Sequence, residues 1–283
     1  MMKRIIPFQE VVEAVCALCG KAAVHLPADV LDALKAGAEK ETQPLAKSFF
    51  GQYLENAEIA EKEQMPLCQD TGFAVFFVEY GENVQVDGEG ITAAINQGVR
   101  EGYKKFYLRK SIVEEPLFER INTKDNTPAV IHFTPVPGDS VKIVLAPKGG
   151  GSENMSALKM MKPSDGKKAL VDFVVDSVKN AGGNPCPPVI VGVGVGGTFE
   201  KCAQIAKRAL LRKVGEPNPD PRYAALEAEL LEKINATGVG SQGLGGDITA
   251  LAVHVEFFPC HIASMPVAVN LNCHAARHAE VVL

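Results

Sequence analysis

The order of its apolar patterns is what most constrains the fold of this chain. Apolar residues recur at helical spacing through residues 8–63, in segments at Phe8–His25, Pro27–Lys40 and Pro44–Glu63. After residue 63, short apolar runs typical of strands alternate with further helical segments. We therefore expect an α/β (α+β) fold in which mixed β-sheets are surrounded by helices and the N-terminal segment is all-helical.

The remaining elements can be predicted from the same patterns. Strands are expected at Phe73–Val78, Ala129–Thr134, Ser140–Ala146, Val189–Val195, Thr249–Phe258 and Pro266–Leu271. Helices are expected at Ile91–Phe106, Lys167–Asn180, Phe199–Lys213 and Arg222–Ala236, with one more opening near Met155. The link Pro135–Asp139 contains proline and glycine, which predicts a hairpin between the two strands that it joins.

Length and composition limit the class of protein. A chain of 283 residues that is 46% hydrophobic can bury a large core, and we expect a single domain over residues 1–283, with a helical segment at about 8–63 and a mixed α/β part at about 64–283. A net charge of −5 favours neither nucleic acid nor an anionic membrane as a partner. No membrane span and no export signal is expected, which predicts a cytoplasmic protein.

Six of the seven cysteines fall into two groups by position, and the seventh, Cys260, precedes His261. An odd number without an export signal argues against a disulfide framework. Cys16, Cys19 and Cys202 lie inside amphipathic helices, where packing in the core is the expected role. Three others lie at junctions between elements: Cys68, Cys186 and Cys273. These junction cysteines are the candidates for chemistry.

Three thiolates suit two kinds of inorganic site. One is a cubane iron–sulfur cluster that leaves one iron without a protein ligand, so that this iron can act as a Lewis acid on a hydroxyl and a carboxylate. The other is a zinc site with three cysteine ligands. The three residues lie far apart in the sequence, so only the fold can bring them together. The residue types alone leave both interpretations open.

Two glycine-containing stretches also carry candidate chemistry. Gly149, Gly150 and Gly151 precede Ser152 at an expected helix start, and their unpaired N–H groups could bind a small anion. The glycines at Gly192–Thr198 resemble a dinucleotide fingerprint, but several lie within the expected strand and no acidic residue ends a second strand at the required distance. Nucleotide binding is therefore the weaker interpretation of the second stretch.

Five motifs follow one another along the chain. They are Cys68-Gln69-Asp70-Thr71-Gly72, Asn122-x-x-Asp125-Asn126-Thr127-Pro128, Gly149-Gly150-Gly151-Ser152-Glu153-Asn154, Asn184-x-Cys186-Pro187-Pro188 and Asn272-Cys273-His274-Ala275-Ala276-Arg277-His278. In this order they resemble the class I, iron–sulfur-dependent fumarate hydratases and their tartrate dehydratase relatives. The resemblance extends from about residue 5 to the end of the sequence.

This resemblance implies a cofactor and a set of site residues. A [4Fe–4S] cluster would be bound by Cys68, Cys186 and Cys273. Substrate would be contacted by Gln69, Asp70, Arg109, the backbone at Gly150, and His261. Arg109 would bind a carboxylate through charge-assisted hydrogen bonds. Asp70, paired with His261, would move the proton that hydration requires.

The resemblance also implies a partner and an activity. Single-chain members continue into a second domain, so this chain resembles the α subunit of the two-subunit form, with a separate β subunit and an α₂β₂ or α–α paired assembly. The implied reaction is the reversible hydration of fumarate to (S)-malate, with L(+)-tartrate dehydration as the alternative. A non-catalytic zinc- or nucleotide-binding module is the alternative from another class.

Overall fold

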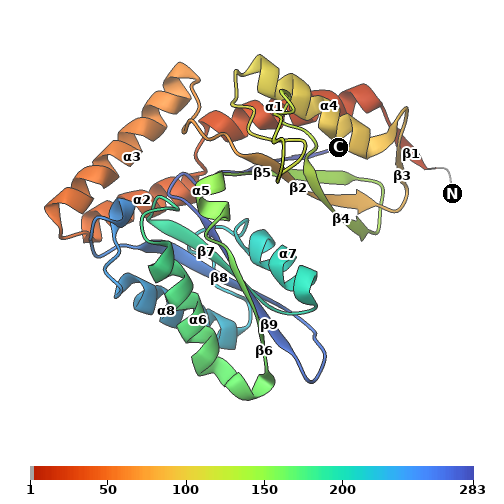
Figure 1. Cartoon of the computed structure of the whole chain (residues 1–283). Coiled ribbons are helices and arrows are strands. Elements are labelled where there is room, and N and C mark those ends of the chain that lie inside the picture. The colour runs from red at the N-terminus through yellow and green to blue at the C-terminus, as the bar shows by residue number, and fades with distance from the viewer. Residues whose placement is uncertain (1–2) are drawn as a thin grey trace. The chain divides into compact units, whose positions relative to one another are not determined.

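The computed structural model describes residues 3–283 (Figure 1). They form two compact units. Unit 1 contains the residues up to Leu26 together with Ala57–Gly150 and Arg277–Leu283. Unit 2 contains Pro27–Asn56 and Gly151–Ala276. Each unit has its own sheet and its own hydrophobic core, as the two separate clusters of buried side chains show.

The N-terminal segment is helical, as predicted. It contains α1 (Phe8–Val24), α2 (Ala28–Lys40) and α3 (Pro44–Glu63), and the boundary between the two units falls within α3. The stretch Phe8–Lys40 is long and apolar enough to be considered as a membrane span. In the structure it is two helices separated at Pro27, and 61% of its most apolar window is buried, as expected of core helices.

Unit 1 is built on a four-stranded sheet with the order β10-β5-β2-β4 (Figure 1). The strands are β2 (Phe73–Gly81), β4 (Val130–Val136), β5 (Val141–Lys148) and β10 (Ala279–Val282). Two short strands, β1 (Arg4–Ile6) and β3 (Val84–Val86), form a separate parallel pair. Helix α1 packs against α4 (Gly90–Lys105), and buried residues of both helices share one core with β2 and β5.

The hairpin predicted from Pro135–Asp139 is wrong. Strands β4 and β5 do not pair with each other, because β2 lies between them, parallel to β4 and antiparallel to β5. Strand β2 is buried along most of its length, and a strand of that kind is most stable with a neighbour on each edge. The turn residues correctly indicated a chain reversal but not which strands it would place side by side.

Unit 2 is built on a second four-stranded sheet with the order β6-β9-β7-β8. The strands are β6 (Ala157–Met161), β7 (Val189–Gly196), β8 (Ala250–Phe258) and β9 (Met265–Asn272). The longer helices are α6 (Gly166–Ala181), α7 (Phe199–Ala209) and α8 (Pro221–Asn235), and the short elements are α5 (Gly150–Glu153), η1 (Pro163–Asp165) and η2 (Ser241–Gly243).

The glycines of β7 allow a helix to pack closely on the sheet. A Cβ atom on Gly192 would lie 2.1 Å from the carbonyl oxygen of Ala206, and one on Gly194 would lie 2.2 Å from that of Cys202, both in α7. Contacts this short are impossible, so only glycine permits this packing. The valines that alternate with these glycines pack in the hydrophobic core of unit 2, together with residues of α6 and α8. The fingerprint-like glycines therefore have a packing role.

The helix predicted near Met155 is also wrong. The glycines Gly150 and Gly151 themselves form the single helical turn α5, and the chain after Met155 becomes the edge strand β6. Strand β6 pairs with β9, which lies about a hundred residues later in the sequence. Its short sequence has no strong period of its own, so this long-range pairing decides its conformation.

Candidate functional site

The turn before β2 carries the first predicted site residues, all in unit 1. The thiol of Cys68 donates to Oε1 of Gln69 at 3.3 Å. Gly72 ends the turn with a φ of +84°, and a Cβ atom there would lie 2.7 Å from the backbone nitrogen of Lys148 in β5. The hydroxyl of Tyr103 donates to the carbonyl oxygen of Gly72 at 2.9 Å. The turn is therefore fixed against the sheet and against α4.

Asp70 is held by three hydrogen bonds within unit 1. Its Oδ1 accepts the N–H of Gly72 at 3.1 Å, and its Oδ2 accepts the N–H of Gly150 at 2.8 Å. The guanidinium of Arg277 donates to its carbonyl oxygen at 2.8 Å. The anion that the glycines at Gly149–Gly151 were expected to bind is thus, at Gly150, the carboxylate of Asp70 itself. Asp70 and Gly150 are thus in direct contact, and their role toward substrate stays a prediction.

Arg109 lies on a braced segment that starts beside the same turn. The hydroxyl of Thr71 donates to the carbonyl oxygen of Arg109 at 3.2 Å. Asn126 accepts the N–H of Ser111 at 2.8 Å, and Asn122 donates to the carbonyl oxygen of Lys110 at 3.0 Å. The Arg109 side chain is exposed, and within residues 3–283 its guanidinium has no hydrogen-bond or ion-pair partner. It is available to an external carboxylate.

Cys186 and Cys273 lie at the same end of the unit 2 sheet. Cys186 precedes β7 and Cys273 follows β9, and these strands are antiparallel with Ile190 opposite Asn272. The carbonyl oxygen of Cys186 accepts two hydrogen bonds from His274, at 3.3 Å from the backbone N–H and at 2.9 Å from Nδ1. Neither cysteine forms a disulfide, and Cys186 is exposed whereas Cys273 is half-buried.

The pKa of Tyr53 is raised mainly by burial. Side-chain hydrogen bonds with Gln242 and Ser241 lower this pKa, and the charges of Cys186 and Cys273 add to the rise. The core cysteines behave differently, as predicted. Cys16, Cys19 and Cys202 are buried. Burial raises the pKa of Cys202 to about 12, which keeps this thiol protonated and unsuited to metal binding.

His261 lies away from Cys186 and Cys273, the two junction cysteines of its own unit. It belongs to the loop between β8 and β9, whereas Cys273 follows the other end of β9. An eight-residue strand is roughly 25 Å long. The side chain of His261 is exposed, and its Nδ1 accepts the N–H of Ala263 at 3.1 Å. The neutral ring therefore carries its proton on Nε2.

The donor set is compatible with an iron–sulfur cluster in chemical type. Cys68, Cys186 and Cys273 form no disulfide and lie on loops, outside both hydrophobic cores. In the described part of the chain, no three His, Cys, Asp or Glu side chains are grouped as ligands of one metal ion would be. In a cubane cluster each cysteine binds a different iron, so its ligands are spread more widely than those of a single ion. The three-cysteine ligand set remains a prediction.

Two residues were not recognised from the sequence. Tyr53 lies in the predicted helix Pro44–Glu63, where the apolar pattern gave it no separate role, although a buried tyrosine hydroxyl needs a polar partner. Its hydroxyl accepts a hydrogen bond from Gln242 and donates to the carbonyl oxygen of Pro187. Arg277 is 6% exposed and contacts Asp70; it lies within the fifth motif, but no role was assigned to it from the sequence.

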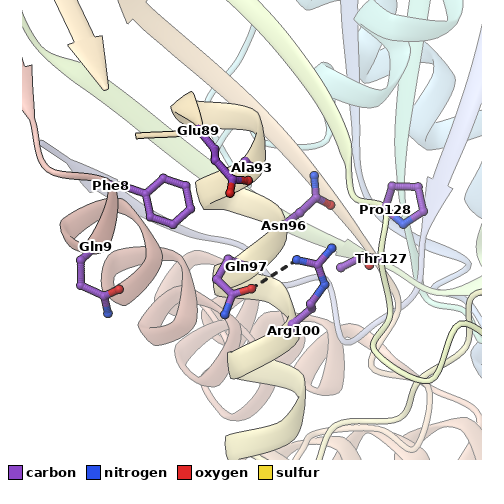
Figure 2. Close-up of a pocket in the computed structure, with 9 residues that line it drawn as sticks. All are labelled: Phe8, Gln9, Glu89, Ala93, Asn96, Gln97, Arg100, Thr127 and Pro128. Carbon is purple, nitrogen blue, oxygen red and sulfur yellow. Dashed lines mark hydrogen bonds between the residues drawn. The ribbon is translucent and has the colours of Figure 1, made fainter. Parts of the chain in front are cut away.

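Two open pockets lie away from the predicted site residues. One, of about 560 Å³, is lined by residues of α1, α4 and the Thr127–Pro128 link (Figure 2). Its arginine, Arg100, donates to Gln97 and forms an ion pair with Asp125 at 3.0 Å. Another, of about 590 Å³, is lined by residues of α6 and the start of β6. Neither lining includes a predicted site residue, so these pockets are distinct from the candidate site.

Comparisons with known proteins agree with the resemblance. Residues 12–282 match the model of the fumarate hydratase (Fumerase) family. A protein of Methanocaldococcus jannaschii, named provisionally as an L(+)-tartrate dehydratase subunit alpha, is 44% identical over 94% of this chain and 95% of its own length. The L(+)-tartrate dehydratase subunit alpha of Escherichia coli strain K12 is 33% identical over 96% of this chain and 90% of its own length. The chain belongs to the fumarate hydratase (Fumerase) family.

Proposed function

We propose that this chain is the α subunit of a cytoplasmic [4Fe–4S] hydro-lyase, most directly a fumarate hydratase that interconverts fumarate and (S)-malate together with a separate β subunit. The observation that carries the proposal is the placement of Cys186 and Cys273, which form no disulfide, at one end of the unit 2 sheet, where His274 binds the Cys186 carbonyl. Cysteines on anchored loops outside the hydrophobic cores suit metal binding better than core packing. Cys68 is the proposed third ligand.

The cofactor and the chain would divide the chemistry. A cluster bound by three cysteines supplies one open iron, a Lewis acid for the oxygen atoms of a dicarboxylate. The chain's own residues bind and orient the substrate and move the proton. The exposed, unpartnered guanidinium of Arg109 suits one substrate carboxylate, which it can bind through two parallel N–H groups.

Gln69 and Gly150 support this arrangement in different ways. The Oε1 of Gln69 accepts from the Cys68 thiol while that thiol is protonated, and the N–H groups of the amide are left for a substrate oxygen. A Cys68 thiolate bound to iron would have no proton to donate, and Oε1 would then be released as well. The N–H of Gly150 is given to Asp70, so this residue contributes by fixing the carboxylate. Gly150 could therefore contact a substrate only through its other backbone atoms, since its N–H is already donated to Asp70.

Asp70 is the proposed proton-handling group. Each of its carboxylate oxygens accepts one backbone N–H, from Gly72 and from Gly150. These bonds fix the orientation of the carboxylate and leave a second lone pair on each oxygen for a proton. A carboxylate held in this way can accept the proton from the carbon of malate and return it to fumarate in the reverse direction.

His261 can take part only in a different way. Because it lies at the opposite end of β9 from Cys273, it cannot reach a substrate bound at the cysteines of its own unit 2. The proposed α₂β₂ assembly contains two α chains, so a second copy is the arrangement that could bring His261 to the site. Its catalytic role is thus tied to α–α pairing.

L(+)-tartrate dehydration is the second candidate. The relatives with 44% and 33% identity carry that name over nearly the whole length of this chain. Tartrate and malate share both carboxylates and one hydroxyl, so Arg109 and Asp70 would serve either substrate. The difference lies in the second hydroxyl of tartrate, which needs one further polar contact.

The test is an assay of the co-expressed α and β chains, purified without oxygen, on fumarate, (S)-malate and L(+)-tartrate. Turnover of fumarate with about four irons per α chain is the expected result. Turnover of tartrate alone would assign the second candidate. A colourless protein with stoichiometric zinc, or full activity of the α chain without its partner, would contradict the proposal.

A further inference from the structure

The loop before β7 holds Cys186 in a conformation that its side chain does not favour. Its φ is +53°, in the left-handed region that residues other than glycine rarely adopt. Such a residue keeps this conformation when its surroundings fix it. Here the N–H of Cys186 donates to the carbonyl oxygen of Gly183 at 3.0 Å, and its own carbonyl accepts both bonds from His274. The peptide is held on both sides.

The next residue, Pro187, is fixed by a second set of contacts. Its carbonyl oxygen accepts the N–H of Gln242 at 2.9 Å and the hydroxyl of Tyr53 at 3.3 Å. The side-chain amide of Gln242 donates to that same hydroxyl at 2.8 Å. A Cβ atom on Gly183 would lie 2.6 Å from the carbonyl oxygen of Gln242, so the two loops meet backbone to backbone.

One side chain contacts both sets of anchors. The ring of Tyr53 stacks on the imidazole of His274, with 4.0 Å between ring centroids and 20° between planes. Its hydroxyl reaches Pro187, as described above. Tyr53 is buried, 8% exposed, and lies on the long helix α3. It therefore links the residue that follows Cys273 to the residue that follows Cys186.

We propose that Tyr53 is a positioning residue for Cys186 and Cys273, holding the two thiols in the geometry in which they bind the cluster. The inference rests on the proposed function, because it takes these two cysteines as ligands. Tyr53 itself touches neither substrate nor reacting atoms in this role. It acts through His274, which binds the Cys186 carbonyl, and through Pro187.

Two variants separate the ring from the hydroxyl. Tyr53→Leu removes both, and Tyr53→Phe removes only the hydroxyl. In the anaerobic α–β complex, the rate at which a chelator removes iron should rise about tenfold or more for Tyr53→Leu, the size of effect expected when a contact that orients a metal ligand is lost. For Tyr53→Phe a rise of about two- to fivefold is expected. Tyr80→Leu is the matched control, because Tyr80 is a half-buried unit 1 tyrosine packed on Phe133.

A second readout distinguishes positioning from general loosening. In the cluster-free complex, alkylation rates mapped by mass spectrometry should change for Cys186 and Cys273 in Tyr53→Leu, while exposed Cys260 of the same unit keeps its wild-type rate. Iron loss at the wild-type rate, or an equal change at all three thiols, would overturn the inference. A wild-type complex that holds no iron would instead overturn the proposed function, and this inference with it.

Discussion

The two sheets have the same strand pattern but different chemistry at corresponding ends. In each, a central strand pairs parallel with one edge strand and antiparallel with its other neighbour, which pairs antiparallel with a fourth strand. The central strands are β2 and β7. In both units the candidate residues other than Arg109 and His261 lie in the turn before the central strand or just after its antiparallel neighbour.

A corresponding hydrogen bond joins the two segments in each unit: a backbone N–H after the antiparallel strand donates to a residue before the central strand. In unit 1 the N–H of Gly150, after β5, donates to the Asp70 carboxylate before β2. In unit 2 the N–H of His274, after β9, donates to the Cys186 carbonyl before β7. The scaffold thus supplies a rigid end twice, and the residue placed there decides the chemistry. Unit 1 presents the carboxylate of Asp70 and the thiol of Cys68, and unit 2 presents the thiols of Cys186 and Cys273.

The largest effect is expected from replacing the junction cysteines. Cys68→Ser, Cys186→Ser and Cys273→Ser should each abolish cluster retention, because a serine hydroxyl is a poor ligand for iron–sulfur iron. Cys16→Ser and Cys202→Ser should retain the cluster, with a loss of about 1–3 kcal/mol in the free energy of unfolding from burying a hydroxyl. Iron and sulfide counts on anaerobic samples measure this. Equal iron loss in all five variants would remove the chemical distinction between the two groups of cysteines.

A smaller effect, on turnover alone, is expected at the unit 1 end. Asp70→Asn keeps the shape of the side chain but removes the group that accepts a proton, so kcat should fall at least about 100-fold. Binding of a malate-like inhibitor should weaken by less than about tenfold. Asp87→Asn is the matched control, since Asp87 also accepts a backbone N–H in unit 1, from Phe8. An unchanged kcat in Asp70→Asn would exclude Asp70 from proton transfer.

The smallest expected effect concerns the scaffold. Gly72→Ala and Gly90→Ala both place a side chain at positive φ, +84° and +80°, which costs about 1–2 kcal/mol. Only at Gly72 would the new methyl group also meet backbone, at 2.7 Å, whereas nothing lies within 4 Å at Gly90. The free energy of unfolding in urea should therefore fall by about 3 kcal/mol or more for Gly72→Ala and about 1 kcal/mol for Gly90→Ala. Equal losses would mean that the turn is less rigid than the structure shows.

The sequence allowed the long elements and the junction cysteines to be predicted, but not the pairing of strands. Helical and strand periods are local, so α3 and β8 were predicted to within a residue. The short strand β6 was missed because its partner lies far away in sequence. The position of His261 depends on the direction and register of β9 against β7, which no local pattern contains. The apolar pattern of the predicted helix Pro44–Glu63 gave no sign that Tyr53 forms hydrogen bonds, because its ring fits the apolar face of that helix.

The open edges of the two sheets bear on the tendency of this chain to aggregate. Both sheets end in strands with one open edge, among them β4 and β6. Strand β4 contains Pro135, which has no N–H to offer an incoming strand, and β6 carries the exposed Lys159. Proline and lysine on an edge discourage pairing with a second chain. The isolated chain is thereby protected against aggregation through these edges.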